Sequence, residues 1–316
     1  MKRETAIVIL NWNRANLTIK LLKNIRSVGE NCDVIVTDNN SSVEEREKLQ
    51  NYFNLEDYPL YSQTQINDIV ERRDCLLVLL DDNYGYAKGN NFGLRIASRL
   101  KYRYVLISNN DIEIVSPVIE DLKNLLEANP DVAVVGPKVS DPDRSNGPYS
   151  KLGMRRLFWK PAFYPFHWIF FHTGKMFRLK SSQSKDIEAE QLSFPYYVSG
   201  SFMLARLSSL EEVDYFDENT FLYGEERILA EKLLAKGYRM AYLPGKEVKH
   251  NHGASTSRLN TDLSRLEFES RLYYFSRYRG YGKIRIAMLR AADRIYDKIW
   301  YPLFQASKRK LRGDEK

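Results

Sequence analysis

Short apolar runs alternate with helical patterns over the first 136 residues, and this alternation constrains the fold more than any other feature. Five runs rich in Val, Ile and Leu are expected to be strands, at residues 6–10, 33–38, 76–80, 104–108 and 131–136. Between them, apolar residues recur at helical spacing. Strands that are apolar on both faces and alternate with helices build a parallel sheet covered on both sides. The sequence therefore predicts an α/β fold with a mostly parallel sheet flanked by helices.

The second half of the chain has a weaker pattern. No period is visible over residues 138–191, after which a strand at 196–205, a helix at 225–236 and two short strands at 239–243 and 247–250 are expected. From residue 262 the chain is expected to be helical, with a break at Gly280–Gly282. We therefore expect one domain over residues 1–260, made of halves 1–136 and 196–260 around a variable insert at 137–195. A basic helical extension would occupy residues 261–316.

Composition indicates a soluble protein of the cell interior. Hydrophobic residues make up 43% of the 316, and Cys32 and Cys75 are the two cysteines. Two cysteines without metal-type spacing favour a reducing compartment. The apolar run at 6–10 is too short for a signal peptide, and no segment has the 18 or so apolar residues of a membrane span. We expect a cytoplasmic location.

Positive charge is concentrated in two segments. Residues 151–180 hold seven Lys or Arg and no acidic residue, while 277–312 hold eleven against Asp293 and Asp297. The first segment includes the aromatic stretch 157–171, which either packs over the sheet as a loop or lies at a membrane interface, where Trp, Tyr and Lys are favoured. The second is either a solvated helix or a membrane contact. Because both segments are basic and rich in apolar or aromatic residues, we favour peripheral contact with an anionic membrane at its inner face.

Acid and amide side chains follow four of the expected strands. They form the clusters 11–13, 38–42, 81–83 and 109–111. Each is also good turn chemistry, but ligands bind beyond the carboxyl ends of parallel strands, where such clusters would meet. Asp111 is a hard oxygen donor of the kind that Mg²⁺ or Mn²⁺ prefers beside phosphate oxygens. The clusters therefore indicate a nucleotide site with a divalent cation over its diphosphate.

Several motifs, in order along residues 5–280, resemble the family 2 inverting glycosyltransferases of the GT-A (Rossmann-like) fold, especially the bacterial rhamnosyltransferase-like group. The similar segments are Ile7–Arg14, Asp38–Ser42, Asn83–Gly93, Asn109–Asp111, Tyr197–Ala205, Phe221–Glu226 and Val248–Thr256. The resemblance implies a nucleotide-diphosphate sugar as donor. The donor-binding residues that follow from it and from the strand-end clusters are Asn11, Asn13, Asp38, Asn39, Ser41, Asn83, Gly85, Lys88, Asn91 and Asn110.

The resemblance also implies the metal and catalytic residues. The family's Asp-x-Asp metal motif falls on Asn109–Asp111, with an amide in the first acidic place, and His250 falls on a third ligand position. Glu226 falls on the general base, where glutamate replaces the family's aspartate, and Glu225 precedes it. For His250 a packing role is the alternative, and two glutamates at a helix start also favour the helix electrostatically.

The predicted function is inverting sugar transfer to an acceptor hydroxyl, with a carboxylate to take the acceptor's proton. The acceptor would be a saccharide or lipid-linked saccharide in bacterial surface polysaccharide assembly. A metal-dependent nucleotidyltransferase is one alternative, although the segment 11–14 is not the glycine- and lysine-rich loop that such enzymes use. A basic nucleic-acid-binding protein is the other, but it leaves the strand-end clusters unexplained. We therefore expect no nucleic acid as partner.

Overall fold

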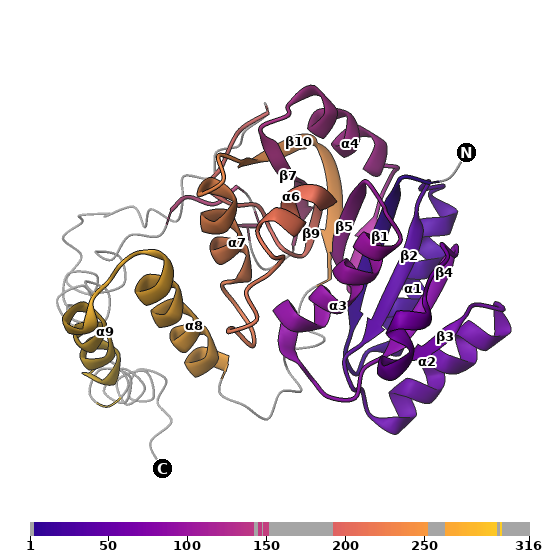
Figure 1. Cartoon of the computed structure of the whole chain (residues 1–316), viewed down its shortest axis with the longest axis horizontal. Helices are drawn as coiled ribbons and strands as arrows, with labels where there is room; N and C mark the ends of the chain where they lie inside the picture. The colour runs from indigo at the N-terminus through magenta and orange to yellow at the C-terminus, as the bar shows by residue number, and fades with distance from the viewer. Residues whose placement is uncertain are drawn as a thin grey trace, which may run out of the picture. The chain divides into compact units, whose positions relative to one another are not determined.

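One mixed sheet runs through the larger part of the chain, with helices against both of its faces (Figure 1). The computed structural model describes residues 3–141, 145–146, 148–151, 192–251, 263–295 and 298. The chain divides into two compact units, one of residues 1–150 with 186–270 and one of residues 151–185 with 271–316. The domain boundaries at 136, 195 and 260 stay a prediction.

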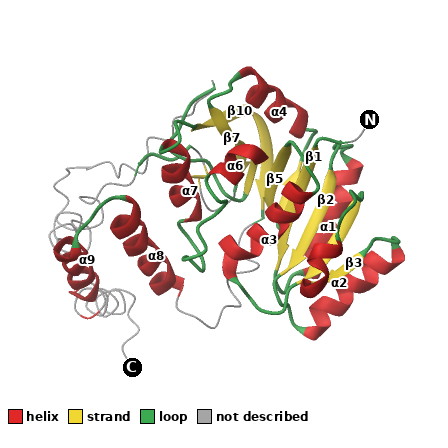
Figure 2. Ribbon diagram, viewed as in Figure 1, coloured by secondary structure: helices red, strands yellow, loops and turns green. Residues whose placement is uncertain are grey.

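The first half alternates strands and helices, as its apolar pattern predicts (Figure 2). Each of the five expected strands is present, and β3, η1, β6 and β8 are additional short elements. The order is β1 (Thr5–Asn11), α1 (Ala15–Ser27), β2 (Asp33–Asp38), α2 (Val43–Leu55), β3 (Leu60–Ser62), the 3₁₀ helix η1 (Gln63–Asp68), β4 (Cys75–Leu79), α3 (Gly85–Arg99), β5 (Tyr104–Asn109), β6 (Ile112–Ile114), α4 (Ile119–Ala128), β7 (Val132–Ser140) and β8 (Ser145–Asn146).

The second half differs from expectation in three places, the first being an additional short helix at residues 207–212. Its elements are β9 (Phe202–Arg206), α6 (Leu207–Glu212), α7 (Glu225–Leu234), β10 (Arg239–His250), α8 (Leu263–Tyr278) and α9 (Lys283–Ile295). The strand expected at 196–205 begins only at Phe202, because the preceding residues form a single bridge at Tyr197 and then turn. The two strands expected at 239–243 and 247–250 are one strand, with a register shift between Leu243 and Glu247.

The sheet is mostly parallel, which confirms the predicted fold class. Its strand order is β3-β4-β2-β1-β5-β9-β7-β10-β6, and β8 pairs with β7. The first five strands are parallel to one another. β9 lies antiparallel between β5 and β7, and β6 lies antiparallel beside β10. The insertion of β9 and β10 brings late segments of the chain next to the strands that end in polar clusters.

Each face of the sheet has its own hydrophobic core. Side chains of β1 alternate between the two, so that Val8 belongs to the core that includes residues of α3 and α7, and Ile7 belongs to the core that includes residues of α1, α2 and α4. α3 lies close to β1, because a Cβ added at Gly89 would lie 2.7 Å from Leu10, and one at Gly93 would lie 2.5 Å from Val8. This close packing sets the first turn of α3 beside the carboxyl end of β1.

Cys32 and Cys75 are both buried and free. Burial raises the pKa of both thiols, that of Cys32 to about 12, so neither is a reactive thiolate at neutral pH. Among the helices in the described ranges, none is long and apolar enough to cross a membrane. The aromatic stretch 157–171 lies outside the described residues, as do His252 and residues 299–316.

Candidate functional site

Asp38 is the centre of a buried polar network at the carboxyl ends of β1 and β2. It is 0% exposed, and its carboxylate accepts hydrogen bonds from Asn11 Nδ2 at 2.7 Å, Ser41 Oγ at 2.5 Å and Arg46 Nε at 2.8 Å. The Arg46 guanidinium also donates to the carbonyl of Leu80, which ties α2 to the end of β4. A buried carboxylate that is paired with an arginine and accepts further hydrogen bonds is stable without a ligand. Asp38 therefore organises this edge of the sheet from within.

Asn11 extends the same network to β5. It is 0% exposed, and its Oδ1 accepts hydrogen bonds from Thr18 Oγ1 at 2.7 Å and Asn110 Nδ2 at 3.2 Å. Asn13 joins at the rim, where its backbone N–H donates to Ser41 Oγ and its Oδ1 accepts from Ser42. The predicted donor residues at the ends of β1, β2 and β5 thus come together, and the innermost of them hold one another.

A pocket of about 150 Å³ lies over this network. Amides supply its polar lining and apolar side chains supply its walls, the full set being Leu10, Trp12, Asn39, Asn83, Gly85, Tyr86, Asn109, Asn110, Phe221 and Leu222. Asn39 Nδ2 donates to Asn83 Oδ1 at 2.8 Å, and Asn39 Oδ1 accepts from the backbone of Tyr84, so these groups are fixed in place. An apolar pocket with a few positioned polar groups is typical of small-molecule sites.

Lys88 and Asn91, two predicted donor residues, belong neither to the pocket lining nor to the polar network around Asp38. The ammonium group of Lys88 lies over the Tyr84 ring, 4.2 Å from its centroid. Asn91 is 0% exposed and bonds to the backbone of Phe216 and to Glu218, which ties α3 to the segment before α7.

Asp111 and His250 meet although 139 residues separate them in sequence. Asp111 Oδ1 lies 2.9 Å from His250 Nε2, and both residues are buried. The pairing of β6 with β10 places His250 opposite Ile112, and the backbone of Asn251 donates to the Asp111 carbonyl. The described residues contain no group of three His, Cys, Asp or Glu side chains that could hold a metal. A carboxylate, an imidazole and a nearby amide nevertheless suit a cation that takes its remaining ligands from phosphate oxygens.

Glu225 and Glu226 open α7 after a constrained turn. Tyr223 and Gly224 both have positive φ, +72° and +91°, and a left-handed conformation is costly for tyrosine. Glu225 points into the protein and is 3% exposed. Glu226 is partly exposed and lies against Gly200, where an added Cβ would be 2.6 Å from its Oε1. The lack of a side chain at Gly200 therefore makes room for the Glu226 carboxylate.

The two glutamates differ in their environment. Burial, and next the negative charge of Glu226, raise the pKa of Glu225 from 4.5 to about 8. Oε1 of Glu225 is buried without a hydrogen-bond partner among the described residues. Glu225 is therefore protonated at neutral pH, whereas a general base must be a carboxylate.

Tyr86, which was not among the predicted site residues, connects the pocket to the glutamates. Its backbone N–H donates to Phe221 O at 2.8 Å, and its hydroxyl donates to Gly200 O at 2.7 Å. Burial and the charges of Glu226, Glu225 and Asp111 raise the pKa of this phenol well above its ordinary value. Tyr86 could have been predicted from its place inside the family-like segment Asn83–Gly93. Arg46 and Thr18, which also belong to the polar network, lie in no such segment and could not have been predicted.

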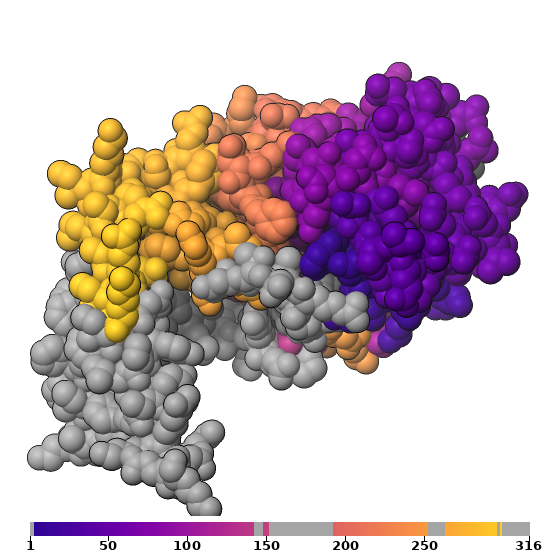
Figure 3. All heavy atoms as spheres, turned by 90° about the horizontal axis from the view of Figure 1, so that it is seen from below, coloured from indigo at the N-terminus to yellow at the C-terminus, as the bar shows by residue number. Residues whose placement is uncertain are grey.

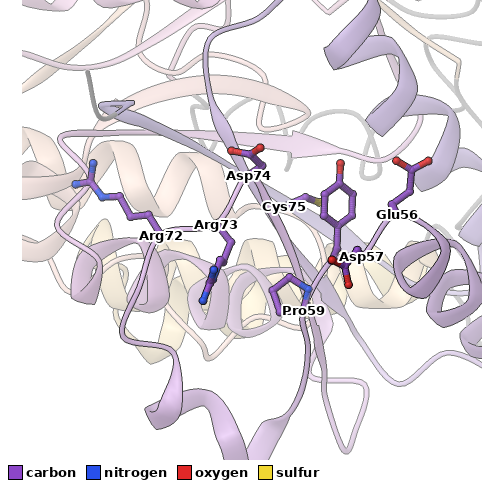
Figure 4. A pocket seen from close by; sticks show the side chains of 8 residues that line it. Glu56, Asp57, Pro59, Arg72, Arg73, Asp74 and Cys75 are labelled. Carbon is purple, nitrogen blue, oxygen red and sulfur yellow. The ribbon is translucent and has the colours of Figure 1, made fainter.

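A larger hollow of about 660 Å³ lies elsewhere on the sheet, near the starts of β3 and β4 (Figure 4). Its lining includes Asp57, Pro59, Arg72, Asp74 and Cys75. None of the predicted site residues lines it. It lies at the amino ends of these strands, opposite the edge where ligands of α/β sheets bind.

Comparison with known proteins identifies the class. The family model described as "Glycosyl transferase family 2" matches residues 6–188. The chain therefore belongs to glycosyl transferase family 2. This membership favours sugar transfer over nucleotidyl transfer and over nucleic-acid binding.

Two curated relatives are N-acetylglucosaminyl-diphospho-decaprenol L-rhamnosyltransferases of Mycobacterium tuberculosis, from strains CDC 1551 / Oshkosh and ATCC 25618 / H37Rv. Each is 28% identical to this chain over 163 residues, which cover 49% of this chain and 49% of the relative. The chain thus spans about half the length of the curated relatives it matches.

Solved structures with the same fold have low sequence identity. They include GalNAc-T7 with UDP, GalNAc and Mn²⁺, with a TM-score of 0.58, 10% identity, and coverage of 95% of this chain and 57% of that one. The mannosyltransferase PcManGT of Pyrobaculum calidifontis with GDP-Man and Mn²⁺ gives a TM-score of 0.52, 15% identity, and coverage of 93% and 70%. TarS of S. aureus gives a TM-score of 0.51 and 15% identity, and the match covers 88% of this chain and 74% of that one. These likenesses confirm the GT-A glycosyltransferase fold.

Proposed function

We propose that this chain transfers a sugar from a nucleotide-diphosphate sugar to an acceptor hydroxyl, with inversion at the anomeric carbon. The observation that carries the proposal is that Tyr86 contacts both the amide-lined pocket and the segment beside Glu226. Its backbone binds Phe221 in the wall of the amide-lined pocket, and its hydroxyl binds the Gly200 carbonyl beside Glu226. A donor in the pocket and an acceptor at Glu226 would therefore be neighbours, as a single displacement requires.

In this proposal the pocket binds the nucleotide. Asn83 and Asn109 offer amide groups for the base and ribose, the buried amide of Asn39 holds Asn83, and Trp12 offers an apolar wall. α3 begins at Gly85 in the pocket lining, and the positive end of its dipole favours the diphosphate. Asn11, Asp38, Ser41 and Asn110 form the support that fixes the pocket amides.

The acceptor side depends on Glu226. Its carboxylate would take the proton of the attacking hydroxyl, since the buried Glu225 keeps its own proton at neutral pH. Glu225 would order the start of α7, and its neutral form spares the site a second negative charge.

Asp111, Asn109 and His250 would hold a divalent cation, Mg²⁺ or Mn²⁺. Bound there, the cation would stabilise the negative charge that grows on the leaving diphosphate. The support is the buried Asp111–His250 contact at the strand ends and the Mn²⁺ named in two structures of the same fold.

The proposed cation site leads to predictions for variants of Asp111 and Asn109. Asp111→Ala should abolish transfer and the Mn²⁺-dependent part of nucleoside-diphosphate binding, because it removes the charged ligand, while Asn109→Asp should keep activity and bind Mn²⁺ more tightly. Titration calorimetry with and without Mn²⁺ measures both. Unchanged Mn²⁺-dependent affinity in Asp111→Ala would remove Asp111 from the site.

We further propose a rhamnosyl or other hexosyl donor and a lipid-linked saccharide acceptor, in polysaccharide assembly at a membrane. The support is the name of the curated relatives. A panel of nucleotide sugars with lipid-linked and free saccharide acceptors tests this, with mass spectrometry of the product and NMR of its anomeric configuration. Inverted product from one donor is expected. A retained configuration, or release of pyrophosphate instead of a nucleoside diphosphate, would contradict the proposal.

Peripheral membrane contact is proposed for α9. Its exposed apolar residues recur on one stripe, Ile284, Ala287, Met288, Ala291 and Ile295, and basic residues flank it, Lys283, Arg290 and Arg294 on one side and Arg285 on the other. The side chains of α9 (yellow) project at the surface in Figure 3. An apolar stripe between basic residues suits an anionic bilayer surface.

A further inference from the structure

Arg227 is a charged residue of the acceptor side that the proposed reaction leaves without a role. It follows Glu226 directly and is the third residue of α7. Its Nε donates to the Tyr197 hydroxyl at 3.3 Å, and its guanidinium carbon lies 5.7 Å from the Tyr197 ring centroid. Tyr197 in turn stacks on Tyr149, with centroids 4.6 Å apart and planes within 6°. The arginine is thus held against an aromatic wall.

Most of the N–H donors of the Arg227 guanidinium have no hydrogen-bond acceptor among the described residues. An arginine offers five N–H donors, and within the described part of the chain Arg227 has this one side-chain hydrogen bond and no carboxylate at ion-pair distance. Burial lowers the pKa of Arg227, but the Tyr197 hydroxyl and the charges of Glu226 and Glu267 outweigh burial, so its pKa is raised and the group stays charged. A charged fork of donors held by an aromatic ring favours a planar or tetrahedral oxyanion such as phosphate.

Arg227 and Glu226 face the same short segment. Glu226 lies against Gly200 and Arg227 against Tyr197. Three residues of extended chain span at most about 10 Å. A hydroxyl at Glu226 and an anion at Arg227 would therefore lie within a distance that one sugar residue with its phosphate can span.

We propose that Arg227 binds the phosphate on the anomeric carbon of the acceptor sugar, and that the acceptor therefore carries an anomeric phosphate, as a sugar diphosphate does. This inference rests on the proposed function and adds the feature by which the acceptor is recognised. The sugar ring would lie along Tyr197–Gly200, with its hydroxyl toward Glu226 and its phosphate toward Arg227. Selection for phosphate at this point would exclude free saccharides.

Binding of two acceptor probes tests the inference without depending on transfer. One probe is N-acetylglucosaminyl diphosphate on a short, soluble prenyl chain, and the other is a phosphate-free alkyl N-acetylglucosaminide. Arg227→Gln should weaken binding of the diphosphate probe about 10- to 100-fold, the scale of a lost charge-assisted contact. It should leave binding of the phosphate-free probe unchanged. Arg227→Lys should restore part of the difference, since lysine keeps the charge and loses the fork.

Lys236→Gln is the control, because it removes one positive charge just beyond α7 at an ion pair with Glu212. It should bind both probes as the wild type does. Equal weakening of both probes by Arg227→Gln would show a structural role through Tyr197 and overturn the inference, as would equal affinity of the wild type for the two probes. Transfer is assayed separately. Diphosphate-selective binding without transfer from any nucleotide sugar would contradict the proposed function and leave the role of Arg227 standing.

Discussion

At the scale of the residue, the site is defined by how each polar side chain is used. Asp38 and Asn11 are fully buried and satisfied by protein partners, while Asn83 and Asn109 line the pocket. The strand-end clusters thus divide between residues that hold one another and residues that line the pocket. The same division separates Glu225, which is buried, from Glu226, which is accessible to an acceptor.

The assignment of the base predicts the kinetics of three variants. Glu226→Gln keeps the volume but cannot accept a proton, so kcat should fall about 10²–10⁴-fold with donor affinity unchanged. Glu226→Asp shortens the reach from Gly200 and should also lose activity. Glu225→Gln is the comparison, since a residue that is already protonated at neutral pH loses little in the change. Steady-state rates with a fixed acceptor measure all three, and the opposite ranking of the two glutamines would move the base to Glu225.

The raised pKa of Glu225 predicts a pH-dependent stability. The unfolded chain releases this proton near pH 4.5 and the folded chain near pH 8. Between these values the folded state binds more protons than the unfolded state, so this group's contribution to stability falls as pH rises. Relative to the wild type, Glu225→Gln should therefore become more stable from pH 5 to pH 8, by up to about 1.4 kcal/mol per pH unit. Urea unfolding at pH 5, 6.5 and 8 checks the trend, and a difference between variant and wild type that stays constant over this range would contradict it.

At the scale of the element, the start of α7 packs against the segment that precedes β9. The Tyr223–Gly224 turn aims Glu226 at Gly200, and Ser270 Oγ of α8 donates to the Leu222 carbonyl at 3.0 Å, which holds the same turn. The position of the proposed base therefore depends on backbone contacts as well as on its own side chain.

Gly200→Ala tests this arrangement. A Cβ there would meet the flexible end of Glu226 rather than backbone, so the carboxylate should move and the fold should survive. We expect a melting temperature within a few degrees of the wild type and a kcat reduced at least tenfold. Gly245→Ala is the matched control, since nothing lies within 4 Å of the added group. Full activity in Gly200→Ala would show that Glu226 does not act from this position.

At the scale of the whole molecule, the chain separates into a unit that carries the site and a unit that includes α9. The predicted pocket, cation and base residues all fall within residues 1–150 and 186–270. Donor binding should therefore not need the C-terminal residues.

Truncation after Tyr281 tests the proposed membrane contact. The full chain should bind anionic vesicles more strongly than neutral ones and lose binding as salt is added, because each basic residue near such a surface contributes about 1 kcal/mol. The truncated chain should bind vesicles more weakly and keep its affinity for nucleoside diphosphate. Cosedimentation and calorimetry measure the two properties. Equal sedimentation of the full chain with neutral and anionic vesicles would contradict the contact.

The sequence alone predicted the alternating strands and helices of the first half, the strand-end clusters and the family motifs, because strand periodicity and turn chemistry are local. Tertiary structure decided which clusters meet. His250 reaches Asp111 only because β10 pairs with β6, and Glu226 reaches Gly200 only because β9 lies between β5 and β7. Likewise, Asp38 is held within the protein because Arg46 and Asn11, which belong to other elements, donate hydrogen bonds to its carboxylate. Asn83 instead lines the pocket. Such contacts join residues far apart in the chain, and no local pattern encodes the strand order that produces them.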